Sequence, residues 1–453
     1  MGGVRERVRV GGVARVSAWD GAVITGGVLV PLVARGLLAR WPLMVDLGDL
    51  LDADRRSTRL LAAMRRKYGY GNTLLVRLPG RRLALVLDAE GVRRVLEGEP
   101  EPFAVANLEK RHAVGRFQPR GVLVSSGPER HLRRQFNEEV LDTGRGIHRL
   151  SEAFTRVVRE EARLLLDLAE DTDLRWEALR VCWARVLRRV VLGDGARDDH
   201  AVTDTLFRLR REANWGYAPR SERTYREFRG RLEGHLRRAE PNSLAGVLAA
   251  TPQTPETAAY DQVPQWLFAF DSAGLVLFRA LALLTSHPVQ DARARTAIVR
   301  DPVALGYLRA CVLESVRLWP TTPAILRDAT RDVDLGGDTL PGGTAVLIPA
   351  TFVQRDAASL PYADSFTPDV WLDGSAADSW SVVPFSGGPA ECPGRDLVML
   401  TTSVFLAELV RDHVYRQTAG RRLSPGLPLP GSFSPYRLRF AVRRLGERGG
   451  DGR

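Results

Sequence analysis

One cysteine of this chain lies in a loop whose composition could hold a reactive thiolate. Residues 384–395 read Pro-Phe-Ser-Gly-Gly-Pro-Ala-Glu-Cys-Pro-Gly-Arg, and helical spacing follows them directly. Gly388 and Gly394 allow close approach of the backbone and unusual dihedral angles. The unpaired amides and positive dipole end of the following helix favour an anionic sulfur at Cys392. Such a sulfur can bind a metal ion, and Phe385 can shield it from water.

A glycine- and proline-rich loop around a buried structural cysteine is the alternative interpretation. A bare Cys-x-Gly sequence would favour that alternative, because free cysteine is usually buried. The spacing Phe385-x-x-Gly388-x-x-x-Cys392-x-Gly394 is far more demanding. It favours a loop that presents the cysteine thiolate as a ligand for a metal ion.

The two remaining cysteines have a different setting. Cys182 and Cys311 lie in apolar helical patterns, so we predict that both are small residues of the core. Three cysteines cannot form an even set of disulfides, and sparse cysteine is typical of a reducing compartment. We therefore expect a cytoplasmic protein.

A Glu-x-x-Arg pair precedes the cysteine loop. Glu314 and Arg317 share one helix face, because side chains three residues apart are neighbours on a helix. Most such pairs are solvated surface ion pairs that stabilise little. This pair lies in an apolar helix, and a buried pair there could bond loop backbone and fix the segment that carries Cys392.

With both motifs present, the chain resembles the cytochrome P450 family, in its soluble bacterial type. The resemblance spans roughly residues 65–440, and outside the two motifs it is one of order and spacing. It implies a b-type haem whose axial iron ligand is Cys392, with Phe385, Gly388 and Gly394 forming the haem loop, and Glu314 and Arg317 as a structural clamp.

The resemblance also implies an acid–alcohol pair that relays protons beside the oxygen site. Asp271 and Ser272 lie in a strongly apolar helix from about 265 to 286 and resemble that pair. The alternative is that Asp271 only caps or kinks the helix. Ser stands where Thr is commoner, and Phe268-Ala269 replaces a pair of small residues, so altered proton delivery stays open.

Cationic side chains should bind the haem propionates. Arg134 fits the register of the family's basic helix best, with His131 as second choice, although either could be a solvated helix charge. Arg327 lies where the family places another propionate contact, and its planar fork suits a carboxylate. Ala390 replaces a frequent His or Arg, so we expect one donor to be missing.

The family's third clamp residue is also absent. Val370 stands where an Arg is expected in the segment Phe366-Thr367-Pro368-Asp369-Val370-Trp371. The clamp must then be completed by backbone, or by another residue such as Arg355.

The order of elements predicts an α+β fold that is mainly helical, with small β-sheets. Two strands around Pro79-Gly80 come early, long helices dominate from about 131 to 239, and strands return after Pro320. Residues 240–262 are expected to form a connector, and 351–390 mostly loop. The expected organisation is a leader of uncertain order (1–50), a single catalytic domain (51–445) and a disordered tail (446–453).

Charge and hydropathy restrict the partners. The formal net charge is +11, almost all of it from arginine that is spread along the chain, which favours an acidic protein over nucleic acid. The apolar stretch from Ala22 to Met44 is broken by Arg35, so we expect a surface-packed or membrane-grazing helix and no integral membrane association.

The resemblance implies a monooxygenase that inserts one atom of O2 into an apolar small molecule, in bacterial secondary metabolism. Without a dinucleotide-binding fingerprint, electrons should come from a separate ferredoxin or flavodoxin with its reductase, steered in part by Arg395. The alternatives are an enzyme that uses peroxide, couples, desaturates or rearranges its substrate, and a non-catalytic haem or gas sensor. A sensor would not need Asp271 and Ser272. The candidate substrate-lining segments are Phe103–Phe117, Asn214–Tyr217, Phe268–Gly274, Thr321–Ile325 and Ser432–Tyr436.

Overall fold

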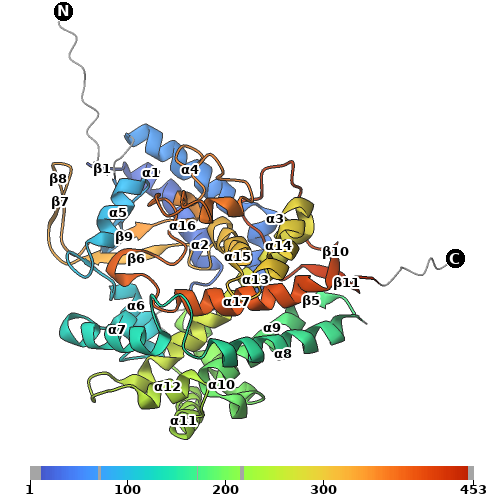
Figure 1. The fold of residues 1–453 in the computed structure, drawn as a ribbon. Coiled ribbons are helices and arrows are strands. Elements are labelled where there is room, and N and C mark those ends of the chain that lie inside the picture. The colour runs from blue at the N-terminus through green and yellow to red at the C-terminus, as the bar shows by residue number, and fades with distance from the viewer. Residues whose placement is uncertain (1–11, 70–72, 171, 215–218, 447–453) are drawn as a thin grey trace, which may run out of the picture.

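A computed structural model describes residues 12–69, 73–170, 172–214 and 219–446. Helices make up most of it, the largest sheet lies at one side of the molecule, and the C-terminal strands lie at the opposite side (Figure 1). The predicted α+β, mainly helical class is therefore confirmed. The predictions for residues 1–11 and for the tail from 447 onward lie outside the described residues.

The largest sheet has six strands in the order β1-β2-β3-β9-β6-β4. β2 and β3 are antiparallel across the Pro79-Gly80 turn, as the alternating pattern predicts. β3 pairs with β9 in parallel, and β9 pairs with β6 antiparallel, so this sheet joins the early and late parts of the chain. The strands are β1 (Val13–Arg15), β2 (Thr73–Leu78), β3 (Arg81–Leu85), β4 (Phe103–Ala104), β6 (Ile325–Ala329) and β9 (Ala345–Ile348).

The remaining described strands form two smaller sheets. The first is ordered β10-β11-β5 and the second is the hairpin β7-β8. Their bounds are β5 (Leu174–Arg175), β7 (Val333–Leu335), β8 (Asp338–Leu340), β10 (His413–Ala419) and β11 (Arg439–Arg444).

Helix α13 (Val263–Ser286) runs through the centre of the helical core. It packs against α9 (Trp176–Leu192), α15 (Gly306–Leu318) and α17 (Arg395–Arg411), so apolar side chains surround most of it. By length and composition alone, the helical segment 259–286 could cross a membrane. However, 72% of its most apolar 18-residue stretch is buried inside the fold. A helix that is apolar on all sides is expected in such a core.

The other described helices include those of the stretch from about 131 to 239, where long helices were predicted. They are α4 (Ala53–Tyr68), α5 (Ala89–Glu97), α6 (Leu108–Ala113), α7 (Gly127–Leu141), α8 (Ser151–Glu170), α10 (His200–Ala213), α11 (Glu222–Arg238), α12 (Leu244–Ala250), α14 (Pro288–Arg300) and α16 (Ala350–Val353).

The connector predicted at 240–262 is wrong in part. Helix α12 lies within it, and the Ser243 hydroxyl caps this helix by accepting a hydrogen bond from the Gly246 N–H. The sequence did not indicate α12, because the helix has fewer than two turns and is surrounded by Pro and Thr residues. Helix α14, which begins at Pro288, was also missed as a separate element, although proline at the first helical position is a favoured start.

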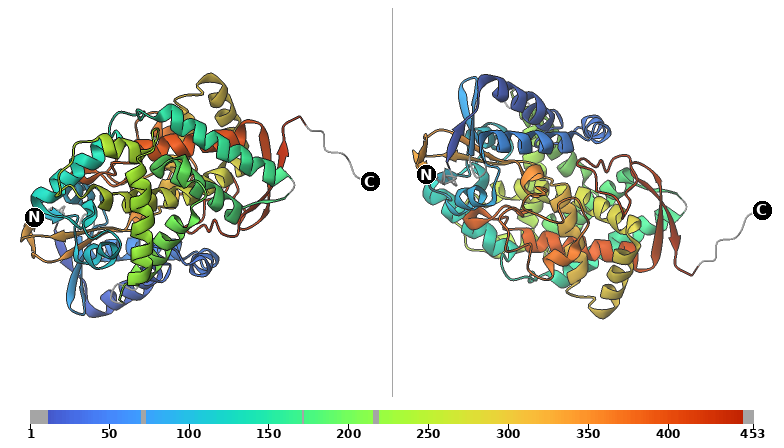
Figure 2. Two further views of the ribbon diagram at one scale, coloured as in Figure 1. Left: turned by 90° about the horizontal axis from the view of Figure 1, so that it is seen from below. Right: turned by 90° about the horizontal axis from the view of Figure 1, so that it is seen from above.

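The described part of the leader is ordered. It contains β1, α1 (Ala18–Ile24), the π-helical turn η1 (Thr25–Leu29), α2 (Val30–Ala34) and α3 (Pro42–Leu50). β1 pairs in parallel with β2, and η1 packs on α4, which ties the leader to the large sheet. In Figure 2 these blue segments lie along one edge of the molecule in both views.

Candidate functional site

The cysteine loop is held by close contacts that only glycine permits. Gly388 has a φ of +64°, and a Cβ atom at this residue would lie 2.1 Å from the carbonyl oxygen of Leu96. The Cys392 N–H donates to the carbonyl oxygen of Phe385 at 3.0 Å. This bond closes the loop and fixes Phe385 relative to the cysteine. Helix α17 begins three residues later, at Arg395.

Cys392 differs from the other two cysteines in its surroundings. Cys182 and Cys311 are buried, as predicted, whereas Cys392 keeps part of its surface exposed. Burial raises the pKa of the Cys392 thiol, and the Gly394 N–H and the charge of Arg134 act in the opposite direction. Of the three sulfurs, that of Cys392 is therefore the one placed to bind a ligand.

The predicted clamp is completely buried. Arg317 Nε donates to Glu314 Oε1 at 2.6 Å and Arg317 Nη2 donates to Glu314 Oε2 at 2.8 Å. The remaining guanidinium hydrogens reach four backbone carbonyl oxygens, those of Gln354, Tyr362, Ala363 and Ser365. A buried charge pair is stable only when all its polar atoms are satisfied, and these carbonyls supply that condition.

The missing third clamp residue is replaced by two donors to Glu314. Glu314 Oε2 accepts from the backbone N–H of Thr367 at 2.8 Å, and Oε1 accepts from Trp371 Nε1 at 3.0 Å. Arg355 takes no part in this, because its guanidinium bonds Asp364 and the carbonyl oxygens of Leu429 and Pro430. The first alternative, backbone, is therefore correct, together with the indole of Trp371.

The clamp connects to the cysteine loop through Gln354. Its carbonyl oxygen accepts from Arg317, and its side-chain Oε1 accepts from the Val383 N–H at 3.2 Å. Val383 directly precedes Pro384, the first residue of the cysteine loop. A continuous set of hydrogen bonds thus runs from Glu314 on α15 to the segment that carries Cys392.

Two predicted cationic residues reach the same loop from opposite sides. Arg134 on α7 donates from Nη1 to the carbonyl oxygen of Glu391 at 2.6 Å. Arg327 on β6 donates from Nη2 to Ser386 Oγ at 3.2 Å, and its Nε bonds Glu99. His131 is exposed on α7 and makes no contact with the loop within the described residues.

The acid of the predicted acid–alcohol pair is bound by an arginine. Asp271 Oδ2 accepts from Arg210 Nη1 at 2.7 Å, while the Asp271 side chain stays 39% exposed. Arg210, on α10, also donates to the carbonyl oxygen of Leu38, and its guanidinium lies 4.2 Å from the centre of the Phe268 ring. Ser272 Oγ makes no hydrogen bond to any described residue.

Comparison with known proteins decides the family. The sequence profile of the family described as "Cytochrome P450" matches residues 288–418, which include the clamp and the cysteine loop. Residues 288–418 therefore belong to the cytochrome P450 family, and the chain has the fold of cytochrome P450 structures. It is 34% identical over 132 residues to cytochrome P450 4g1 of Drosophila melanogaster, covering 28% of this chain and 24% of that protein. It is 31% identical over 174 residues to cytochrome P450 714C3 of Oryza sativa subsp. japonica, covering 35% and 34%.

The fold is shared over a much longer stretch than the sequence. The solved structure of retinoic acid bound cyanobacterial CYP120A1 superposes with a TM-score of 0.71 at 18% identity, covering 85% of this chain and 94% of that one. By sequence, however, the chain spans only 24% to 32% of the length of the first three curated relatives that it matches.

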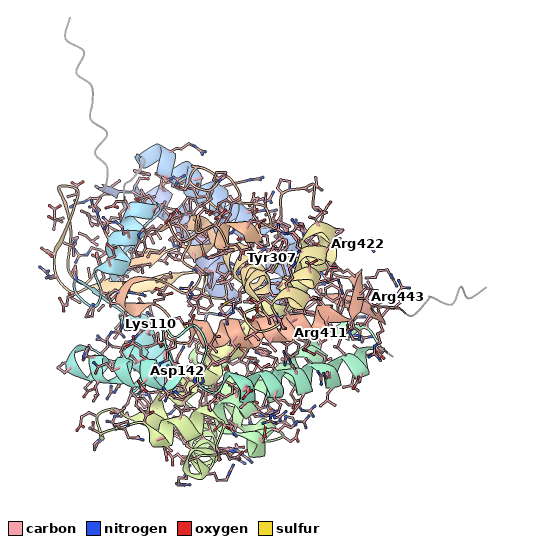
Figure 3. The ribbon with its side chains drawn as sticks, viewed as in Figure 1. Lys110, Asp142, Tyr307, Arg411, Arg422 and Arg443 are labelled. Atoms are coloured by element: carbon pink, nitrogen blue, oxygen red, sulfur yellow. The ribbon has the colours of Figure 1, made fainter. Side chains whose placement is uncertain are left out.

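The residues of this P450 near the loop fit a haem group. Arg130, which the sequence reasoning missed, is buried on α7, and burial lowers its pKa. Lys110 lies between the sheet and α7 (Figure 3), and burial together with Arg327 lowers its pKa strongly. Arg130 and Lys110 both lie within electrostatic range of Arg327 and of one another.

This cluster has more positive than negative charge. Glu99 is its buried carboxylate, and its Oε2 has no hydrogen-bond partner among the described residues. Glu138 is paired with Arg134, and Asp328 is paired with Arg81. The two carboxylates of a haem would supply the missing negative charge beside Cys392, so the donor set fits the group that the P450 family implies.

The structure brings together two of the five predicted substrate-lining segments. Thr321 and Pro323 of one segment line a small cavity with Phe433 and Tyr436 of another, and Leu275, the residue directly after the segment Phe268–Gly274, lines it as well. Of the other three segments, two are in contact, because Phe117 packs edge-on against Phe268, and Asn214 of the third bonds the backbone of the leader. Residues 215–217 lie outside the described residues.

Proposed function

We propose that this P450 is a haem-thiolate monooxygenase that inserts one atom of O2 into an apolar small molecule. The observation that carries the proposal is the cysteine loop itself: Cys392 is partly exposed, and the loop is fixed by the Glu314–Arg317 clamp through Gln354. Arg134 and Arg327 reach the same loop and would bind the carboxylates of a b-type haem. When bound, haem supplies the activation of oxygen.

The chain's own part in the chemistry is to hold the sulfur and to move protons. The closed loop and the clamp keep the Cys392 sulfur at the start of α17, where backbone amides favour its anionic form. The hydroxyl of Ser272 makes no hydrogen bond to a described residue and can pass a proton. Asp271 can do so only when its hydrogen bond to Arg210 breaks. Proton delivery in this protein therefore depends on α10 as well as on α13.

Electrons are proposed to come from a separate ferredoxin or flavodoxin with its reductase. Support comes from the sequence, which lacks a dinucleotide-binding fingerprint, and from its formal charge of +11, which suits an acidic partner. Arg395 is exposed next to the cysteine loop, although it already pairs with Glu391 at 2.8 Å.

A cytoplasmic location and a role in bacterial secondary metabolism are part of the same proposal. The location rests on three free cysteines in a chain of this length, and the metabolic role rests on the resemblance to the soluble bacterial type alone. An apolar substrate is consistent with the neighbouring fold of CYP120A1, whose structure has retinoic acid bound.

A second candidate is a P450 that takes its oxygen from peroxide. The observation in its favour is the ion pair between Asp271 and Arg210, which occupies the carboxylate that proton delivery would use. Peroxide already contains the protons and electrons that the O2 reaction requires. Product formation with donor, NADPH and oxygen, compared with peroxide alone, distinguishes the two.

The first test is a spectrum of the reduced, carbon monoxide-bound protein. Thiolate ligation moves the main absorption band to a longer wavelength than histidine ligation gives. We expect Cys392→Ala to abolish that band, while Cys182→Ala and Cys311→Ala keep it. A band that persists in Cys392→Ala, or protein that takes up no haem, removes the proposal.

A further inference from the structure

The cavity next to α13 is lined by an unusual concentration of positive charge. It is partly enclosed, has a volume of about 50 Å³, and is lined by Arg35, Arg40 and Arg279 among other residues. Asp54 is the acidic residue of the wall, and both its oxygens accept from Arg35 at 2.6 Å. The charge of Arg35 is therefore balanced, and the charges of the other two are not.

Arg40 and Arg279 are held by carbonyl groups rather than by carboxylates. Arg40 donates to the carbonyl oxygens of Gly36 and Thr321, both at 2.7 Å, and its Nε makes no hydrogen bond within the described part of the chain. Arg279 donates to the carbonyl oxygens of Phe433 and Trp319. These bonds orient the two guanidiniums, but they add no negative charge.

Burial makes this arrangement costly in the absence of an anion. Burial lowers the pKa of Arg40 to about 10, with Arg35 contributing repulsion, and lowers that of Arg279 to about 10 as well. The nearby carboxylates have other partners: Asp49 pairs with Arg421, and Asp46 accepts from Ser434 Oγ.

Tyr436 adds a neutral donor to the same wall. Burial raises the pKa of its hydroxyl to about 12, so the hydroxyl stays protonated, although Arg40 and Arg279 both act on it in the opposite direction. Arg40, Arg279 and Tyr436 thus line the same space. A carboxylate is the small anion that matches such a set of donors.

The position and size of the cavity indicate which part of a ligand it would take. It adjoins Leu275 on α13 and the Thr321–Pro323 segment, so it is continuous with the residues assigned above to substrate. A water needs roughly 10–15 Å³ of such volume, so about 50 Å³ has room for a carboxylate and not for a whole apolar substrate.

We propose that Arg40, Arg279 and Tyr436 form a subsite for the carboxylate of an apolar acid, so that the substrates of this P450 are amphipathic carboxylic acids. The inference rests on the proposed function. The leader residue Arg40 then contributes directly to substrate choice, although it lies far from Cys392 in the sequence.

The test measures binding of matched acids and esters to the haem-loaded protein. Fatty acids of 8 to 16 carbons, their methyl esters and the corresponding alcohols are titrated while the haem absorption band is followed. We expect the best acid to bind at least about tenfold more tightly than its ester, because a charge-assisted hydrogen bond is worth about 1.5–3 kcal/mol. Arg40→Gln should bring that ratio close to one by weakening the acid alone.

Two further variants separate the effect of the Tyr436 hydroxyl from a general effect of removing an arginine. Tyr436→Phe removes only the hydroxyl and should weaken acids by about threefold or more, whereas Arg437→Gln changes an exposed neighbouring arginine and should leave the ratio unchanged. Equal binding of acid and ester, or no acid-specific binding across the series, overturns the subsite. If the haem-loaded protein lacks the long-wavelength carbon monoxide band, the proposed function is wrong, and the result does not bear on the subsite.

A second inference comes from an independent feature, the apolar surface of the leader. Helices α1, η1 and α2 form one run whose exposed residues Trp19, Val30 and Val33 are all apolar, and Trp19 is 77% exposed. Helix α3 adds Leu43 and Leu50, which are 82% and 75% exposed. None of the four charged residues between 21 and 51 is in an exposed position.

A basic surface lies next to this apolar one. Helix α4, which packs on η1 and α3, exposes Arg56, Arg59 and Arg66, and none of these pairs with an acidic group among the described residues. Apolar side chains beside unpaired arginines complement the interface of an anionic bilayer, where the arginines meet lipid phosphates. We infer that this edge of the molecule, which Figure 2 shows in blue, docks peripherally on an anionic membrane surface.

Vesicle sedimentation of the haem-loaded protein tests the docking. The full chain should sediment with phosphatidylglycerol vesicles and much less with phosphatidylcholine vesicles, and salt should weaken the binding. Leu43→Asp with Leu50→Asp should lower the bound fraction at least fivefold, whereas Val299→Asp, at an 83% exposed position on α14, should not. No binding, or a dimer in solution that the double variant converts to monomer, overturns the inference.

Discussion

Arg210 on α10 binds Asp271 on α13 through a contact of 2.7 Å, and the same guanidinium is held by the carbonyl oxygen of Leu38 in the leader. Arg210 thus joins α10, α13 and the leader, three separate parts of the chain. Asp271 is therefore an ion-paired side chain rather than a simple helix cap. Any role of Asp271 in proton transfer is tied to the position of α10.

Proton delivery can be tested by comparing two oxygen sources. Asp271→Asn should slow product formation from O2 by about a hundredfold, because a positioned proton donor typically contributes that much or more. Ser272→Ala should lower the product formed per O2 consumed and release peroxide. With peroxide as the oxygen source, both variants should stay within about threefold of the parent protein. Unchanged product yield per O2 in Ser272→Ala would mean that Ser272 is not a relay.

The clamp should contribute strongly to stability. Glu314→Gln leaves Arg317 as a buried charge without its partner, which should cost about 3–5 kcal/mol of unfolding free energy. Trp371→Phe removes one neutral donor to Glu314 and should cost about 1–2 kcal/mol. Denaturant unfolding measures both, with Arg293→Gln, which breaks an exposed ion pair, as control. Equal losses in all three variants would contradict the assigned role.

Gly388 allows a test of the loop geometry. Gly388→Ala should abolish haem binding or greatly reduce it, because the added Cβ would lie 2.1 Å from a backbone oxygen of α5 and its φ of +64° is strained for alanine. Gly343→Ala is the matched control, since Gly343 has a φ of +74° but open space around it. The control should lose about 1–2 kcal/mol of stability and keep its haem. A haem spectrum retained by Gly388→Ala would contradict the prediction.

The cationic cluster predicts a difference between two neighbours on α7. Arg130→Gln should weaken haem uptake by the apoprotein about tenfold, because Arg130 is buried beside Glu99 and Arg327. His131→Gln should have no effect, because His131 is exposed. Absorbance titration with haem measures both affinities. A larger loss in His131→Gln would restore His131, the second choice from sequence after Arg134, as a haem contact.

Acid sensitivity should follow from a buried histidine near the clamp. Burial lowers the pKa of His287, and its ring packs against Phe366. The unfolded state then binds the proton more readily, so this contribution is fully present above a pH of about 6.5 and is lost as pH falls below it. His287→Gln should flatten the fall in unfolding free energy between about pH 7 and pH 5. His131→Gln, at an exposed site, should leave the slope unchanged.

The sequence by itself determined the features that depend on local spacing. The cysteine loop, the Glu-x-x-Arg pair and the central apolar helix could be recognised because each is set by residues within one segment. Side chains three or four residues apart on a helix share a face in any fold, and a glycine that must take a positive φ is needed wherever the loop lies. The α+β class followed from the same periodicities.

Only the tertiary structure decided which distant side chains meet. Trp371 takes over from the arginine absent at Val370, Arg130 turns inward while its neighbour His131 faces solvent, and Arg40 joins Arg279 at one cavity. No local pattern marks these residues, since each could be a solvated charge or a packing residue in isolation. Their roles depend on the burial of apolar surface, which brings segments hundreds of residues apart into contact and removes water from between their charges.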